Sequence, residues 1–211
     1  GIFRQTSEGD WELIGGGVGQ GFGPGVVSDL EYYDGELFLS GCFNYLGGDA
    51  ESPDAIYTSQ LARWDGSAWI PVESTAPLTA WYDPRPCGAW TARQRLLVHD
   101  GLLYVAGNFG ATGDVASQGL AAWDGEKWLP AGGPGGQGVT GVVQKFAVGG
   151  PSCTLYALGL LTHGGGVPTA SGVLRWEDGW HAVGGARPAK HQCDQLAVDA
   201  EGRVFVGCTT F

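Results

Sequence analysis

The sequence of 211 residues contains no methionine, no Cys-x-x-Cys pair and few basic side chains. Eleven lysines and arginines stand against 22 aspartates and glutamates, which gives a net charge of -11. Because nucleic-acid binding needs basic surface that neutralises phosphates, this balance argues against a nucleic-acid partner. The missing Cys-x-x-Cys leaves a zinc ribbon or a thioredoxin-type site without support. No apolar run approaches the roughly 18 residues of a membrane-spanning helix, so membrane insertion is not expected.

Glycine is abundant, with 39 residues, while 43% of the chain is hydrophobic and 11% aromatic. This hydrophobic content argues against disorder, so we expect the glycines to mark turns. The start without methionine and the lack of any methionine lead us to expect a processed or excised piece of a longer protein, which is compatible with prior removal of a signal peptide. The five cysteines are compatible with an oxidising compartment. Together these features predict an extracellular or cell-surface protein.

A sequence motif with two tryptophans around an Asp-Gly turn recurs along the chain. It reads "LARWDGSAWIPV" at 61–72, "LAAWDGEKWLPA" at 120–131 and, altered, "VLRWEDGWHAV" at 173–183. The second tryptophans, together with Trp11 near the start, follow one another at intervals of about 50 to 60 residues, which is typical of a repeat architecture. The two indoles flank a predicted hairpin turn, where cross-strand contacts stabilise by roughly 0.2 to 1 kcal/mol. Most of the nine tryptophans are therefore interpreted as packing residues.

A second hairpin precedes each of these motifs. The first example is "LEYYDGELFLSGCF" at 30–43, in which β-prone segments flank Asp34-Gly35. Each unit then holds four antiparallel strands, the arrangement of a β-propeller blade. We predict an all-β protein, a single propeller domain over 1–211, with blades at about 16–73, 74–132, 133–185 and 186–211 plus 1–15. In this closed four-bladed ring the two ends share the last blade; the alternative is a fragment of a larger propeller.

These motifs, a strand ending in "GNF" or "GCF", a Gly-Gly-bearing loop and then "WDGxxW", cover nearly the whole chain. They resemble the kelch-like propeller repeats of exported bacterial proteins and of a class of fungal cell-surface proteins. The resemblance implies a propeller in an extracellular setting. It implies no reaction.

Two long loops, 42–60 and 73–95, are expected at the same rim of the propeller. Aromatic side chains beside carboxylates and an arginine can stack on a sugar ring or bind a peptide, so the predicted partner is a glycan or a protein. The competing interpretation is that Trp81 and Trp90 only cap the blade core. The candidate ligand-binding residues are Tyr45, Asp49, Asp54, Trp81, Tyr82, Asp83, Arg85 and Trp90.

Two disulfides are proposed on geometric grounds. Cys42 and Cys87 would join the two long loops, with a stabilisation of about 2 to 4 kcal/mol. If Val198 faces Arg203 across the "DAEG" turn, the same register places Cys193 opposite Cys208. Cys153 is left over, either free or paired with another chain. The alternative is that the cysteines are buried small apolar residues.

Metal and catalytic signals are weak. Asp49, Glu51 and Asp54 are oxygen ligands of the kind that calcium prefers, but they lack EF-hand spacing, so a solvated acidic turn is favoured and no cofactor is predicted. No Ser-His-Asp or Cys-His arrangement can be assembled. The favoured function is non-catalytic binding of a glycan or protein partner. The alternatives are a structural module of an extracellular fibre or cell-envelope assembly and a propeller glycoside hydrolase with paired carboxylates.

Overall fold

A computed structural model describes residues 1–21, 23–58, 60–72, 94–107, 111–112, 115–116, 119–131, 138–186 and 191–210. In these residues the protein is all-β, and all its strand pairs are antiparallel. No helix of the described part has the length and apolar character to cross a membrane. The sequence-based prediction of an all-β class is confirmed.

Three sheets with the same four-strand order follow one another along the chain, and we name them the first, second and third blades. The first contains β5 (Val26–Tyr33), β6 (Glu36–Cys42), β9 (Leu61–Trp64) and β10 (Trp69–Pro71). The second contains β11 (Arg95–His99), β12 (Leu102–Ala106), β15 (Leu120–Trp123) and β16 (Trp128–Pro130). The third contains β17 (Val139–Gly149), β18 (Thr154–Gly164), β20 (Val173–Trp176) and β21 (Trp180–Ala182), with β19 (Val167–Pro168) paired to β18. The strand positions within a blade are named A to D in chain order.

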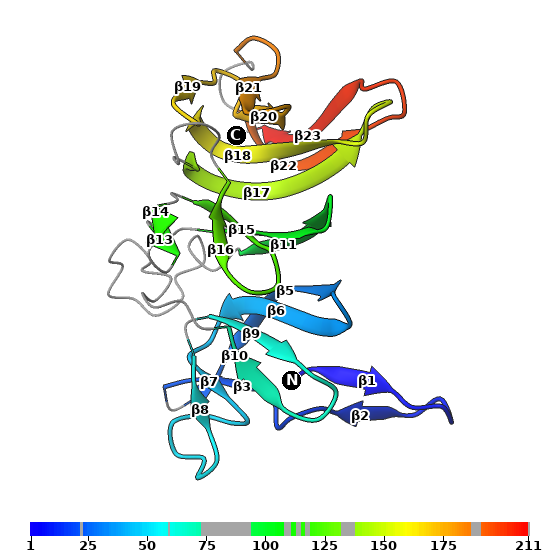
Figure 1. The fold of residues 1–211 in the computed structure, drawn as a ribbon, viewed down its shortest axis with the longest axis vertical. Helices are drawn as coiled ribbons and strands as arrows, with labels where there is room; N and C mark the ends of the chain where they lie inside the picture. The colour runs from blue at the N-terminus through cyan, green and yellow to red at the C-terminus, as the bar shows by residue number, and fades with distance from the viewer. Residues whose placement is uncertain are drawn as a thin grey trace.

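Two further hairpins lie outside these blades. β1 (Phe3–Gln5) and β2 (Trp11–Leu13) form one two-stranded sheet, and β22 (His191–Val198) and β23 (Val204–Thr210) form another. The first lies in the lower part of the molecule and the second in the upper part (Figure 1). In the described residues the two hairpins form separate sheets, and each packs on the blade next to it in sequence. The closed four-bladed ring, in which the two ends share one blade, stays a prediction.

Short strands add two small sheets beside the blades. β3 (Val18–Gln20), β4 (Gly23–Pro24), β7 (Tyr45–Leu46) and β8 (Ile56–Tyr57) make a four-stranded sheet. β13 (Ala111–Thr112) and β14 (Val115–Ala116) make a two-stranded one. The hairpin turns between A and B strands point to one side of the molecule, whereas β7, β8, β13 and β14 lie toward the other (Figure 1).

Sequence explains the hairpins directly. Asp34 and Gly35 have φ values of 48° and 83°, and Asp100 and Gly101 have values of 48° and 74°. Two successive positive φ values define the type I′ turn, whose twist matches that of the flanking strands and which favours Asp-Gly. The paired indoles lie directly opposite each other across the C–D turns: Trp64 with Trp69, Trp123 with Trp128, and Trp176 with Trp180.

The described residues form four apolar core clusters, each between two neighbouring units. The Trp180 indole crosses one of these boundaries, because its Nε1 donates to the Ala131 carbonyl of the second blade at 2.7 Å. The A strands are joined by polar contacts. Arg95 of β11 donates to the carbonyls of Ser28 on β5 (3.4 Å) and Gln144 on β17 (2.9 Å). One arginine thus links the A strands of all three blades.

Candidate functional site

The structure describes three of the eight predicted ligand-binding residues: Tyr45, Asp49 and Asp54. The predicted residues Trp81, Tyr82, Asp83, Arg85 and Trp90, together with Cys87, lie outside the described residues. The described part of the predicted rim is therefore the loop that carries β7 and β8.

Tyr45 and Asp54 lie on different faces of the β7–β8 hairpin. Tyr45 is paired with Tyr57, and their rings meet edge to face with centroids 5.9 Å apart. The next pair along the hairpin is Leu46 with Ile56. Because successive side chains of a strand point to opposite faces, Leu46 and Ile56 occupy the other face of β7 and β8. Asp54 lies on the side of Leu46 and Ile56.

Asp49 shapes its own loop. Its carboxylate Oδ1 accepts hydrogen bonds from the Glu51 amide and the Ser52 hydroxyl, each at 3.1 Å. These local bonds are typical of a polar turn, where aspartate replaces a backbone acceptor. Within the described ranges, no group of three or more potential metal-binding side chains is found.

A cleft of about 190 Å³ lies between this loop and the C–D hairpin of the first blade. We name it the Trp64 cleft. It is lined by Gly15, Leu46, Gly47, Asp54, Ile56, Trp64, Ser67, Ala68 and Trp69. Asp54 and Ile56 are exposed, and Trp64 is half-buried. The cleft thus combines an apolar wall with one accessible carboxylate.

The C–D turn holds one wall of the Trp64 cleft in place. The Asp65 carboxylate accepts hydrogen bonds from the backbone amides of Ser67 and Ala68, both at 2.8 Å. These backbone amides, Ala68 first, hold the pKa of Asp65 below its ordinary value of 3.8. The Trp64 and Trp69 rings are 5.1 Å apart and tilted by 59°. Since both indoles are fixed by the turn, the wall is formed before any ligand arrives.

The cleft offers an aromatic surface next to a carboxylate. The Trp64 Nε1 is buried and has no acceptor among the described residues, so the ring presents carbon to the cleft. An aromatic surface beside a carboxylate that accepts hydroxyl hydrogen bonds suits the alternating apolar and hydroxyl faces of a sugar. Among the described residues of this lining, Asp54 is the single carboxylate, whereas glycoside hydrolysis uses two carboxyl groups across one cleft.

A second cleft of about 190 Å³ lies between the first and second blades, beside Asp34, Glu36, Arg63 and Trp123. Both Glu36 carboxylate oxygens accept hydrogen bonds from Arg63. The Tyr33 hydroxyl, also in the lining, donates to the Gly101 carbonyl at 3.0 Å. Burial, then the charges of Asp34 and Asp124, raise the pKa of Tyr33. These polar groups are thus engaged within the protein, and the cleft is better explained as a blade junction.

Of the two predicted disulfides, one lies wholly within the described residues. Cys193 and Cys208 form a disulfide, as predicted. The expected register is wrong by one residue, because Val198 lies opposite Val204 and not Arg203. A β-bulge between Cys193 and Gln195 compensates for this shift and returns Cys193 to Cys208. Cys42 is also disulfide-bonded, but its predicted partner Cys87 is outside the described residues. Cys153 is free and exposed.

Sequence reasoning missed two wall residues, Trp64 and Ile56. Trp64 was assigned to packing as one of a cross-strand pair, which is true of one face of its ring. The neighbouring residues Ile56 and Tyr57 could have indicated the wall residue, because a strand at this point places their side chains on opposite faces. No protein-family model matches the chain, and no curated protein matches it either.

Proposed function

We propose that this protein is a non-catalytic, extracellular β-propeller unit that binds a glycan through the Trp64 cleft. The propeller arrangement is supported by three successive four-stranded blades of identical order whose A strands contact one another. The extracellular setting is supported by the Cys193–Cys208 disulfide, since disulfides persist in oxidising compartments.

The observation that carries the binding proposal is the pairing of a fixed indole wall with Asp54 and Ile56 at the mouth of one cleft. Ile56 is 45% exposed, so its side chain is accessible to a ligand in the cleft. A cleft of about 190 Å³ is smaller than the typical pocket for a drug-sized ligand. It is therefore suited to one sugar ring of a larger glycan that extends into solvent.

A panel of mono- and oligosaccharides tests this proposal, with each hit titrated by calorimetry. We expect Asp54→Asn and Ile56→Ser each to weaken binding about tenfold, which corresponds to the loss of about 1.4 kcal/mol of contact energy. The matched control is Tyr57→Ser. Tyr57 is adjacent to Ile56 and even more exposed, but its ring packs on Tyr45, on the other face of the hairpin.

Absence of any saccharide hit would refute the glycan proposal. An equal loss of affinity in Tyr57→Ser and Ile56→Ser would place the ligand outside the Trp64 cleft. Binding to a protein, with no binding to any saccharide of the panel, would favour a protein partner.

A structural role in an extracellular assembly is the second candidate. It is favoured by a separate observation, the exposed aromatic side chains Trp11 and Phe205 on the two terminal hairpins. Such exposed apolar groups on sheet hairpins are typical of interaction surfaces.

A further inference from the structure

The boundaries between complete blades are built from the same two aromatic positions. One is an aromatic residue on the B strand of the preceding blade, and the other is the tryptophan that begins the D strand of the following blade. Phe38 and Trp128 fill these positions between the first and second blades. Tyr104 and Trp180 fill them between the second and third blades. All four side chains are buried.

The two outer boundaries are each half-built. Among the described residues, the cluster between the β1–β2 hairpin and the first blade contains Trp69 but no aromatic residue from a preceding B strand. The cluster between the third blade and the β22–β23 hairpin contains Tyr156 but no following D-strand tryptophan from the described part of the chain. The first of these boundaries therefore has only the D-strand tryptophan, and the second has only the B-strand aromatic residue.

The missing side chains are present, exposed, on the two hairpins. Trp11 begins β2 opposite Gln5, as Trp69 begins β10 opposite Trp64, and it is 68% exposed. Phe205 on β23 holds the position that Phe38 holds in the first blade. Each lies three residues before the B-strand residue, Cys208 or Gly41, that pairs with the A strand just before its bulge. Phe205 is 56% exposed. The same aromatic positions are thus buried in complete blades and exposed at the ends.

The two hairpins are also complementary as strands. β22 and β23 occupy positions A and B, and β1 and β2 occupy positions C and D. In complete blades the B-strand aromatic residue faces an arginine of the C strand twice, as Phe38 opposite Arg63 and Tyr156 opposite Arg175. The same register places Phe205 opposite Arg4.

We propose that β23 of one copy of this chain pairs with β1 of a second copy, which completes a blade from two chains. Phe205 of the first copy then fills the cluster around Trp69 of the second, and Trp11 of the second copy fills the cluster around Tyr156 of the first. One strand pairing therefore buries both exposed aromatic groups and both open sheet edges.

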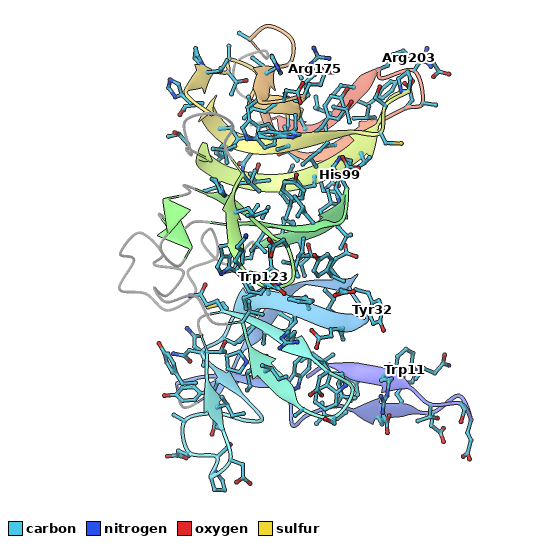
Figure 2. The ribbon with its side chains drawn as sticks, in the orientation of Figure 1. Trp11, Tyr32, His99, Trp123, Arg175 and Arg203 are labelled. Atoms are coloured by element: carbon cyan, nitrogen blue, oxygen red, sulfur yellow. A yellow bond between two sulfur atoms is a disulfide. The ribbon has the colours of Figure 1, made fainter. Side chains whose placement is uncertain are left out.

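The occupant is a second copy because one chain holds the two hairpins far apart. Trp11 on β2 lies in the lower part of the molecule, and Arg203 beside β23 lies in the upper part (Figure 2). Each copy holds three complete blades and half of each of two shared ones, so two copies form a ring of eight blades. Rings of four to eight blades are typical of propellers, and head-to-tail contacts that close give a ring.

Light scattering of the purified chain tests the pairing. We expect twice the mass of one chain for the wild type, and the mass of one chain for Trp11→Ser and for Phe205→Ser. Tyr32→Ser is the matched control, since Tyr32 is 65% exposed but lies on β5, away from either hairpin, and this variant keeps the double mass. Unchanged far-ultraviolet circular dichroism checks that each variant folds. A single-chain mass for the wild type, or an open-ended series of masses, overturns the two-copy ring.

A disulfide trap tests the register, in a Cys153→Ser background that removes the free exposed thiol. Copies with Gln5→Cys are mixed with copies with Val204→Cys and oxidised; this pair is next to Arg4 and Phe205 in this register, so that both aromatic side chains stay in place. We expect an interchain disulfide on a non-reducing gel. Gln5→Cys mixed with Val206→Cys is the off-register control and forms none. A disulfide that forms only when both substitutions are in one chain overturns the proposal and indicates closure within a copy. The inference rests on the proposed propeller arrangement, and neither test depends on glycan binding.

Discussion

Replacing Trp180 with phenylalanine should destabilise the protein more than the same replacement at Trp128. The two indoles hold equivalent positions on neighbouring blades, and both are buried. Each packs on its paired tryptophan with ring centroids 5.2 Å apart. They differ in one contact. The Trp180 Nε1 donates to the Ala131 carbonyl at 2.7 Å, whereas the Trp128 Nε1 is buried without an acceptor in the described part of the chain.

The loss of ring volume and of aromatic contact is common to both variants and cancels in the comparison. Trp180→Phe additionally leaves the Ala131 carbonyl without its donor, and a buried group that loses its partner costs about 1 to 3 kcal/mol. Trp128→Phe removes an N–H group that was already unpaired, so no such penalty arises. The free energy of unfolding should therefore fall by about 1 to 3 kcal/mol more for Trp180→Phe.

Equilibrium urea unfolding followed by circular dichroism measures this difference, provided that both variants show the same dependence on denaturant. Equal losses of stability, or a larger loss for Trp128→Phe, would refute the argument that the indole hydrogen bond holds the second and third blades together.

Three further outcomes are expected. The double substitution Cys193→Ser, Cys208→Ser should lower stability by about 3 kcal/mol, the entropic value for residues separated by 15 positions, and thermal unfolding that is insensitive to the bridge would contradict this. Gly159→Ala should destabilise strongly, because its Cβ would lie 1.9 Å from the Val142 carbonyl oxygen, while Gly185→Ala, which has open space, should leave the melting temperature unchanged. The pKa values of Asp65 and Asp124 should lie below 3.8 by NMR titration, since backbone amides bind their carboxylates. Their contribution to stability is then present above the ordinary pKa and is lost as pH falls through the lowered pKa, an acid loss that Asp65→Asn should reduce.

Much of the blade could be predicted because its signals are local. An Asp-Gly pair between β-prone segments specifies a tight hairpin, and the structure shows the positive φ values that such a turn requires at Asp34 and Asp100. The cross-strand pairing of Trp64 with Trp69 follows from the turn alone. The Cys193–Cys208 disulfide was predicted from the strand register. That register is wrong by one residue next to the turn and correct at the cysteines, because a bulge that no local pattern indicates lies between the two.

The rest depends on contacts between distant segments. The B–C loop of the first blade is held against the start of the chain, where the Gly47 amide donates to the Gly17 carbonyl at 2.9 Å. This long-range pairing places Asp54 in the same cleft as Trp64, which local sequence cannot show. The shared blade stays a prediction for a related reason. The β1–β2 and β22–β23 hairpins are complementary in sequence, but complementarity does not say whether they meet within one chain.

The binding proposal is tested most directly by the indole N–H resonances in a titration with the saccharide panel. The account predicts that the Trp64 signal shifts saturably with one of the sugars, while the signals of Trp11 and Trp180 do not move. A saccharide that binds without moving Trp64, or that moves Trp11 instead, would contradict the assignment of the Trp64 cleft as the binding site.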